Sequence, residues 1–157
     1  MSCEKDRDFE YDSVTMAKAM VAYANAKGYS ISMTKLQKLL YIAYGVYLAA
    51  GKGRLVDEHP QAWPYGPVFP HTREQLLNKL SECESSKEID ENPVVSSLID
   101  AVYKAYGNYS ASALSQWSHK KGSPWDETIK GDDCNLGNEI PDYLIEDYFS
   151  RLLGKDK

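Results

Sequence analysis

Histidine, cysteine and paired carboxylates are the side chains that could carry catalysis in this sequence, because they transfer protons, attack electrophiles and bind metals. The three histidines are His59, His71 and His119, and none belongs to an HExxH motif or stands at ligand spacing from a cysteine. The pattern therefore indicates no zinc site. We expect the protein to need neither a metal nor an organic cofactor.

The cysteines and the adjacent carboxylates do not indicate a reaction either. Cys3, Cys83 and Cys134 lie far apart and form no CxxC pair, which argues against a disulfide framework and favours a reducing compartment. The adjacent carboxylates Asp57 and Glu58 are expected to diverge and to face solvent. With no nucleophile motif in the chain, we expect a protein that is not an enzyme.

Length, composition and charge favour one globular domain inside the cell. The chain has 157 residues, 43% of them hydrophobic and 26% charged, which are ordinary values for such a domain. A net charge of −5 disfavours a general nucleic-acid binder, so no nucleic acid is expected as a partner. The chain has no apolar run long enough to span a bilayer, and its first residues are too charged for a signal peptide. These features predict a cytoplasmic protein with no membrane partner.

Hydrophobic periodicity predicts a mainly α fold, a single compact domain of about six helices. The clearest helix spans residues 33–50, and Ser32 is its expected N-cap. Its apolar face is wide and consists of Leu36, Leu39, Leu40, Ala43, Tyr44, Tyr47 and Leu48. A face of this width is typical of a helix near the centre of a domain.

The remaining elements follow from capping residues and from breaks in the pattern. Helices are predicted after Asp12, Asn92, Ser110 and Ser123, around Pro70, and over 145–152. Residues 54–68 are predicted to form a small extended or β element that runs into a rigid turn. Residues 1–11 are predicted to be a polar leader, and residues 12–154 the helical domain. Residues 81–91 are charged and poor in apolar side chains, which predicts an exposed connector.

Aromatic residues and prolines cluster in three short stretches, AWPYGPV at 62–68, WSH at 117–119 and SPW at 123–125. Two prolines and a glycine within four residues of the first stretch end regular structure and indicate a rigid turn. Tryptophan and tyrosine on such turns are typical of binding hot spots. The same residues also serve to pack a turn onto neighbouring helices, and the sequence leaves both roles open.

Three stretches of the chain resemble the Panacea domain of SocA-like antitoxins and phage-associated proteins. They are ISMTKLQKLLY at 31–41, AWPYGPV at 62–68, and LSQWSH at 114–119 with PW at 124–125. They occur in the family's order, and the resemblance spans roughly residues 14–150. One departure is Ser118, at a position where family members often have threonine.

The resemblance implies an antitoxin that neutralises a co-encoded protein toxin by direct binding, either by occlusion or as an adaptor that delivers the toxin to a cellular protease. It does not imply which toxin, because Panacea domains are paired with unrelated toxins. The motif or partner-binding positions that it implies are Trp63, Tyr65, Gly66, Pro67, His119, Pro124 and Trp125. Gly66 and Pro67 would fix the backbone direction, and the two tryptophans would supply apolar area. His119 would either link the two segments or contact the partner.

Two other functions fit the same sequence. The first is a phage or prophage protein that binds a host factor, and a neighbouring toxin gene would argue against it. The second is a hydrolase or transferase that uses His119 with an acidic partner. A carboxylate beside that histidine in a concave site would support the enzyme.

Overall fold

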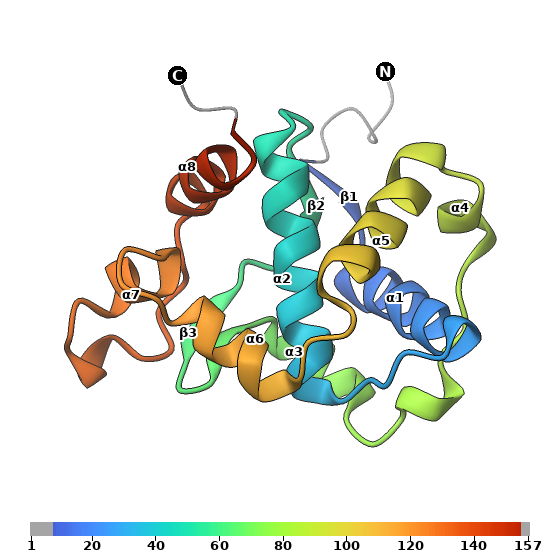
Figure 1. The fold of residues 1–157 in the computed structure, drawn as a ribbon, viewed down its shortest axis with the longest axis horizontal. Helices are drawn as coiled ribbons and strands as arrows, with labels where there is room; N and C mark the ends of the chain where they lie inside the picture. Colours follow the sequence, from blue (N-terminus) through green and yellow to red (C-terminus); the bar gives the residue numbers. More distant parts are fainter. Residues whose placement is uncertain (1–7, 155–157) are drawn as a thin grey trace.

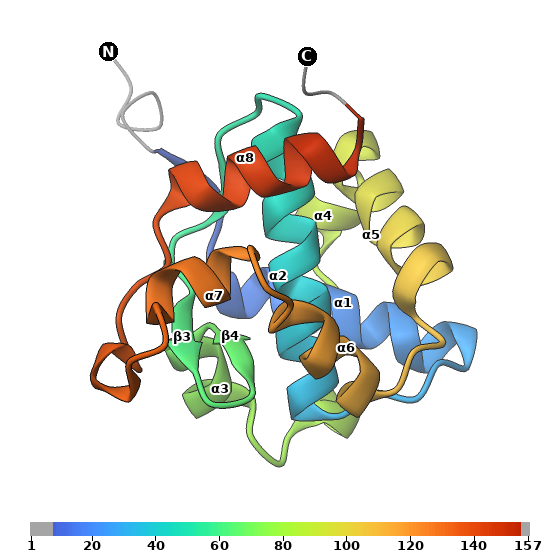
Figure 2. The ribbon, with the colours of Figure 1, turned by 60° about the vertical axis from the view of Figure 1, so that its left-hand side comes forward.

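The longest helix, α2 (Met33–Ala49), lies at the centre of the protein, and the other elements surround it (Figures 1 and 2). It begins where the Ser32 hydroxyl accepts a hydrogen bond from the backbone N–H of Lys35 at 3.2 Å. It ends before Gly51, whose φ of 78° takes the chain out of the helix. Thirteen of its seventeen residues are buried. The prediction of a central helix over residues 33–50 is confirmed.

The computed structural model describes residues 8–154, and it confirms the mainly α class. Its strands are β1 (Phe9–Tyr11), β2 (Arg54–Val56), β3 (Gln61–Trp63) and β4 (Gly66–Val68). Its other helices are α1 (Ser13–Lys27), α3 (Pro70–Leu76), α4 (Lys87–Asp90), α5 (Pro93–Tyr106), α6 (Ala111–Ser118), α7 (Pro124–Ile129) and α8 (Asp142–Leu152). There are eight α-helices in this range rather than about six, and the one that was not predicted is α4, which has only four residues. No helix in this range is both long and apolar enough to cross a bilayer.

Part of the predicted polar leader belongs to the fold. Residues 9–11 form β1, which pairs in parallel with β2 and places Tyr11 opposite Val56. The Tyr11 ring is buried, and its hydroxyl accepts a hydrogen bond from the Asn92 side-chain amide at 2.8 Å. Leader residues 1–7 lie outside the described range. A three-residue strand gives too short a pattern to be predicted from sequence.

Asp57 and Glu58, in the loop after β2, cap two helices. Asp57 accepts a hydrogen bond from the backbone N–H of Ser13 at the start of α1, at 2.9 Å. Glu58 accepts hydrogen bonds from the backbone N–H groups of His71 and Thr72 at the start of α3, at 2.8 and 2.9 Å. Carboxylates stabilise helix N-termini, where the N–H groups lack partners within the helix. Asp57 is exposed, as predicted, whereas Glu58 is half-buried, so the prediction that both carboxylates face solvent is wrong for Glu58.

The predicted connector 81–91 is also more ordered than expected. It contains a 3₁₀ turn over Leu80–Glu82, followed by α4, which Ser86 caps. Ile89 on α4 is only 1% exposed and belongs to the core. This one apolar side chain anchors the segment to the core. The periodicity of the segment is too weak to indicate a helix from sequence.

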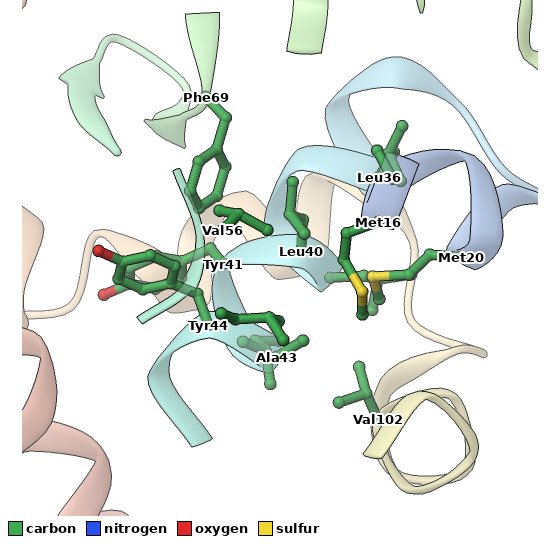
Figure 3. Close-up of a cluster of buried hydrophobic side chains, with 14 of the residues drawn as sticks. Met16, Met20, Leu36, Leu40, Tyr41, Ala43, Tyr44, Val56, Phe69 and Val102 are labelled. Carbon is green, nitrogen blue, oxygen red and sulfur yellow. The ribbon is translucent and has the colours of Figure 1, made fainter. Parts of the chain in front are cut away.

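The core lies mainly between α2 and the helices on either side of it. Figure 3 shows Met16 and Met20 of α1 beside Leu36 and Leu40 of α2, with Val102 of α5 on the same side. All five side chains are buried. The core thus buries α2, and α2 in turn carries the residues that support the candidate site.

Candidate functional site

The WPYGP motif forms the tip of a β-hairpin. Strands β3 and β4 pair antiparallel with Trp63 opposite Gly66, so Pro64 and Tyr65 make the turn. Figure 2 shows this hairpin beside α6 and α7, which carry the second and third sequence clusters. Tyr65 is 72% exposed, whereas Pro67 is buried. The extended element and the rigid turn predicted for residues 54–68 are both present.

Three successive carbonyl oxygens of the turn accept hydrogen bonds from α6, α7 and the loop between them. The Trp125 indole N–H donates to the carbonyl of residue 63 at 2.8 Å. The His119 Nε2 lies 2.7 Å from the carbonyl of residue 64, and the Ser115 hydroxyl donates to that of residue 65 at 2.7 Å. The rings of His119 and Trp125 also pack together, with centroids 4.0 Å apart. The structure therefore brings the sequence clusters together.

Helix α2 holds the same hairpin from below. The Lys38 ammonium donates to the carbonyl of Pro67 at 3.1 Å. The Gln37 side-chain amide accepts from the backbone N–H of Phe69 at 2.7 Å and donates to its carbonyl at 3.3 Å. Lys38 is only 1% exposed, and burial lowers its pKa to about 8. Neither residue was predicted as part of the site, although polar side chains on a helix that is buried all round must have internal partners.

Gly66 makes the close approach of these elements possible. Its φ is 116°, a backbone conformation that residues other than glycine rarely adopt. A Cβ atom there would lie 2.4 Å from the Ser118 hydroxyl and 2.6 Å from the Cε of Lys38. A glycine at this position therefore lets the hairpin, α6 and α2 approach one another closely.

The last predicted positions start α7. Pro124 is buried at the first position of this helix, and the Ser123 hydroxyl accepts from the backbone N–H of Asp126 at 3.2 Å. The same hydroxyl donates to the carbonyl of Ser118 at 3.0 Å, which joins α7 to the end of α6. The Asp126 carboxylate accepts from the backbone N–H of Gly122 at 2.9 Å. This capped start places Trp125 against the hairpin.

The histidines of the structure bind neighbouring groups. Both ring nitrogens of His119 face backbone carbonyls, since its Nδ1 lies 2.5 Å from the carbonyl of Ser115. His59 has a carboxylate neighbour that sequence analysis missed, with its Nδ1 3.7 Å from Asp142. Its other nitrogen lies 3.2 Å from the Arg54 guanidinium, a group that only donates hydrogen bonds. Neither ring presents a free nitrogen, and within residues 8–154 no three His, Cys, Asp or Glu side chains gather as metal ligands would.

Surface hollows lie on both sides of the exposed Tyr65. On one side a groove of about 450 Å³ runs between α2, the hairpin and α3, and Trp63 and Arg73 are among its lining residues. On the other side a hollow of about 330 Å³ lies toward α6 and includes Ser115. Thr34 and Tyr65 border both hollows. We call this continuous area, from Arg73 across Tyr65 to Ser115, the hairpin surface.

Comparison with known proteins places these elements in a family. The family model described as "Antitoxin SocA-like, Panacea domain" matches residues 36–126, a range that contains the hairpin and Trp125. The chain is also similar to Antitoxin SocA of Caulobacter vibrioides (strain NA1000 / CB15N), with 34% identity over 155 residues. That alignment covers 88% of this chain and 82% of the relative. No solved structure matches the chain.

Proposed function

The chain belongs to the SocA-like antitoxin family with a Panacea domain, and we propose that it neutralises a co-encoded protein toxin by binding it directly through the hairpin surface. Family membership supports the antitoxin role in general. The proposal adds the direct complex and the surface that forms it.

The observation that carries the proposal is the exposure of Tyr65 on a turn that is otherwise fixed. Side chains of α2, α6, α7 and the loop before α7 hold the backbone carbonyls of residues 63–65 and 67, while the Tyr65 ring is 72% exposed. A rigid aromatic side chain loses little conformational entropy when a partner covers it. Tyrosine is also enriched among residues that dominate binding energy. The hollows on either side provide room for the partner's side chains.

The experiment compares two tyrosines that are equally exposed. Tyr143 on α8 is 71% exposed and lies outside the hairpin surface, so it is the matched control for Tyr65. The chain or its variant is co-expressed with the product of the neighbouring gene, and growth and co-purification are measured. Tyr65→Ala is expected to lose rescue and about thirty-fold in affinity, a typical effect for a hot spot. Tyr143→Ala is expected to behave as the wild type.

Two results would contradict the proposal at different levels. Full rescue by a folded Tyr65→Ala variant would place the toxin-binding surface elsewhere on the protein. Failure of the wild type to rescue growth or to bind the neighbouring product would refute the direct complex itself. The lifetime of the toxin then separates the two modes of neutralisation. Occlusion leaves that lifetime unchanged, whereas delivery to a protease shortens it.

A further inference from the structure

The groove beside Tyr65 differs in charge from the rest of the protein. Its apolar wall includes Met33, Trp63 and Leu77, and its charged lining residues are Lys38 and Arg73. Both charges are positive, and no acidic side chain lines the groove. The chain as a whole carries a net charge of −5. A cationic and largely apolar groove on an acidic protein indicates a ligand that is both anionic and apolar.

Lys38 lies in this groove without an acidic partner. Within the described part of the chain, no ion pair involves Lys38 or Arg73. An ammonium group has three N–H donors, and the carbonyl of Pro67 accepts only one of them. A buried cation without a counter-ion is costly, so a carboxylate from outside would relieve a cost that the free protein carries.

Arg73 is the exposed member of the pair. It lies on α3 with its guanidinium 5.8 Å from the centroid of the Trp63 ring, which orients it over an aromatic face of the groove. A planar guanidinium can bind a carboxylate through two parallel hydrogen bonds. The groove thus combines one buried and one exposed cation with apolar walls, in a volume of about 450 Å³ that suits a few side chains of a bound segment.

We propose that this groove binds an extended segment of the toxin that places an aspartate or glutamate side chain against the exposed Arg73 and near the buried Lys38, with an adjacent apolar side chain on Met33 and Leu77. This inference rests on the proposed direct complex. It names the chemistry of the partner segment, namely an acidic side chain beside an apolar one.

The first test is charge reversal with a matched control. Arg73→Glu is expected to lose rescue of cells that express the product of the neighbouring gene, with affinity at least about thirty-fold weaker. Lys52→Glu makes the same change in charge at an exposed position beyond the opposite end of α2 and is expected to rescue normally. Thermal melting shows whether both variants are folded. Normal rescue by a folded Arg73→Glu variant, while the wild type also rescues, would overturn the groove and leave the direct complex intact.

The second test identifies the partner residue. A library of toxin variants is selected for growth with Arg73→Glu, and the survivors are kept only if they still kill cells that lack the antitoxin. Substitutions of aspartate or glutamate by lysine or arginine in one toxin segment are the expected result. Suppressors that alter only uncharged residues would overturn the carboxylate.

The third test separates a side-chain carboxylate from a chain terminus. The identified segment is made as a peptide acetylated and amidated at its ends, together with a form that has glutamine or asparagine for the acidic residue. Nuclear magnetic resonance of the labelled wild-type protein is expected to show shifts at Thr34 and Leu77 with the acidic peptide and much weaker shifts with its amide form. Equal shifts with both peptides would overturn the proposal.

Discussion

The imidazole of His119 lies 2.7 Å from the carbonyl oxygen of Pro64, 55 residues earlier in the chain, and joins the second and third stretches of the family resemblance. The sequence is compatible with two roles for this histidine, a link between the two segments and a contact with the partner. The geometry shows the link, because the second ring nitrogen also faces a carbonyl, that of Ser115. Its ring further packs on Trp125.

Substitution of His119 is therefore expected to lower stability. His119→Ala removes both contacts with carbonyl oxygens and the packing on Trp125, for a loss of about 1–3 kcal/mol in the free energy of unfolding. His71→Ala is the control, because the His71 side chain is exposed. Its ion pair with Glu74 is long, at 3.7 Å, and lies on the surface. Urea unfolding measures both variants. Equal stabilities would mean that the His119 link contributes nothing.

Two glycines with positive φ provide a second comparison. Gly66→Ala is expected to cost about 2–4 kcal/mol, because strain in the backbone adds to the clash of the new methyl group with Ser118 and Lys38. Gly53→Ala should cost only about 1 kcal/mol, since its φ is 85° but nothing lies within 4 Å of the added Cβ. Denaturant midpoints measure the difference. A similar loss of stability in both variants would show that Ser118 and Lys38 move to accommodate the new methyl group without cost.

The buried Lys38 predicts a dependence of stability on pH. Its pKa falls to about 8 in the folded protein, from the ordinary value of 10.5. Between these values the unfolded chain binds more protons, so the contribution of Lys38 to stability rises with pH in this window. The penalty of the buried charge is fully present below pH 8 and amounts to the order of 3 kcal/mol. Lys38→Met removes it.

The measurement is the difference in unfolding free energy between Lys38→Met and the wild type from pH 7 to 9.5. The variant is expected to be the more stable protein at pH 7, and its advantage should shrink as the pH rises above 8. Other titrating groups are common to both proteins and cancel in the difference. A difference that does not change with pH would contradict the prediction. If the groove inference holds, the same variant neutralises the toxin less well despite its greater stability.

The cap that Glu58 provides to α3 is testable in the same way. Glu58→Ala removes the acceptor of the backbone N–H groups of residues 71 and 72 and is expected to cost about 1–2 kcal/mol. Glu74→Ala, an exposed acidic position on the same helix, is the control and should change stability by less than about 0.5 kcal/mol. Thermal melting of the two variants distinguishes them. An unchanged Glu58→Ala protein would show that water replaces the carboxylate.

The helix starts could be predicted from the sequence because their causes are local. Asp12, Ser32, Asn92, Ser110 and Ser123 all cap helices as expected, since each accepts from an N–H group no more than three residues away. The family motif was also recognisable as three separate stretches. These features need no knowledge of how the chain folds back on itself.

The contacts that assemble the site could not be predicted, because most of their acceptors are backbone carbonyls. Every residue has a backbone carbonyl, so nothing in the sequence indicates that the carbonyl oxygen of residue 64 is the one that contacts His119. The carboxylate of Glu58 likewise meets α3 only through the tertiary fold. Gln37 and Lys38 are different, since two polar residues within a helix buried on every side are a signal that was available.

The hairpin is anchored through backbone carbonyls at residues 63, 64, 65 and 67. Its backbone conformation therefore does not depend on which side chain stands at position 65. The residue at position 65 can change while its own carbonyl still accepts the Ser115 hydroxyl. The side chain at position 65 can therefore vary, in evolution or in a combinatorial library, without loss of the hydrogen bonds that hold the hairpin. Antibody frameworks tolerate new loop sequences in the same way. If the hairpin surface binds the toxin as proposed, substitutions at position 65 are expected to change the partner while the hairpin keeps its fold.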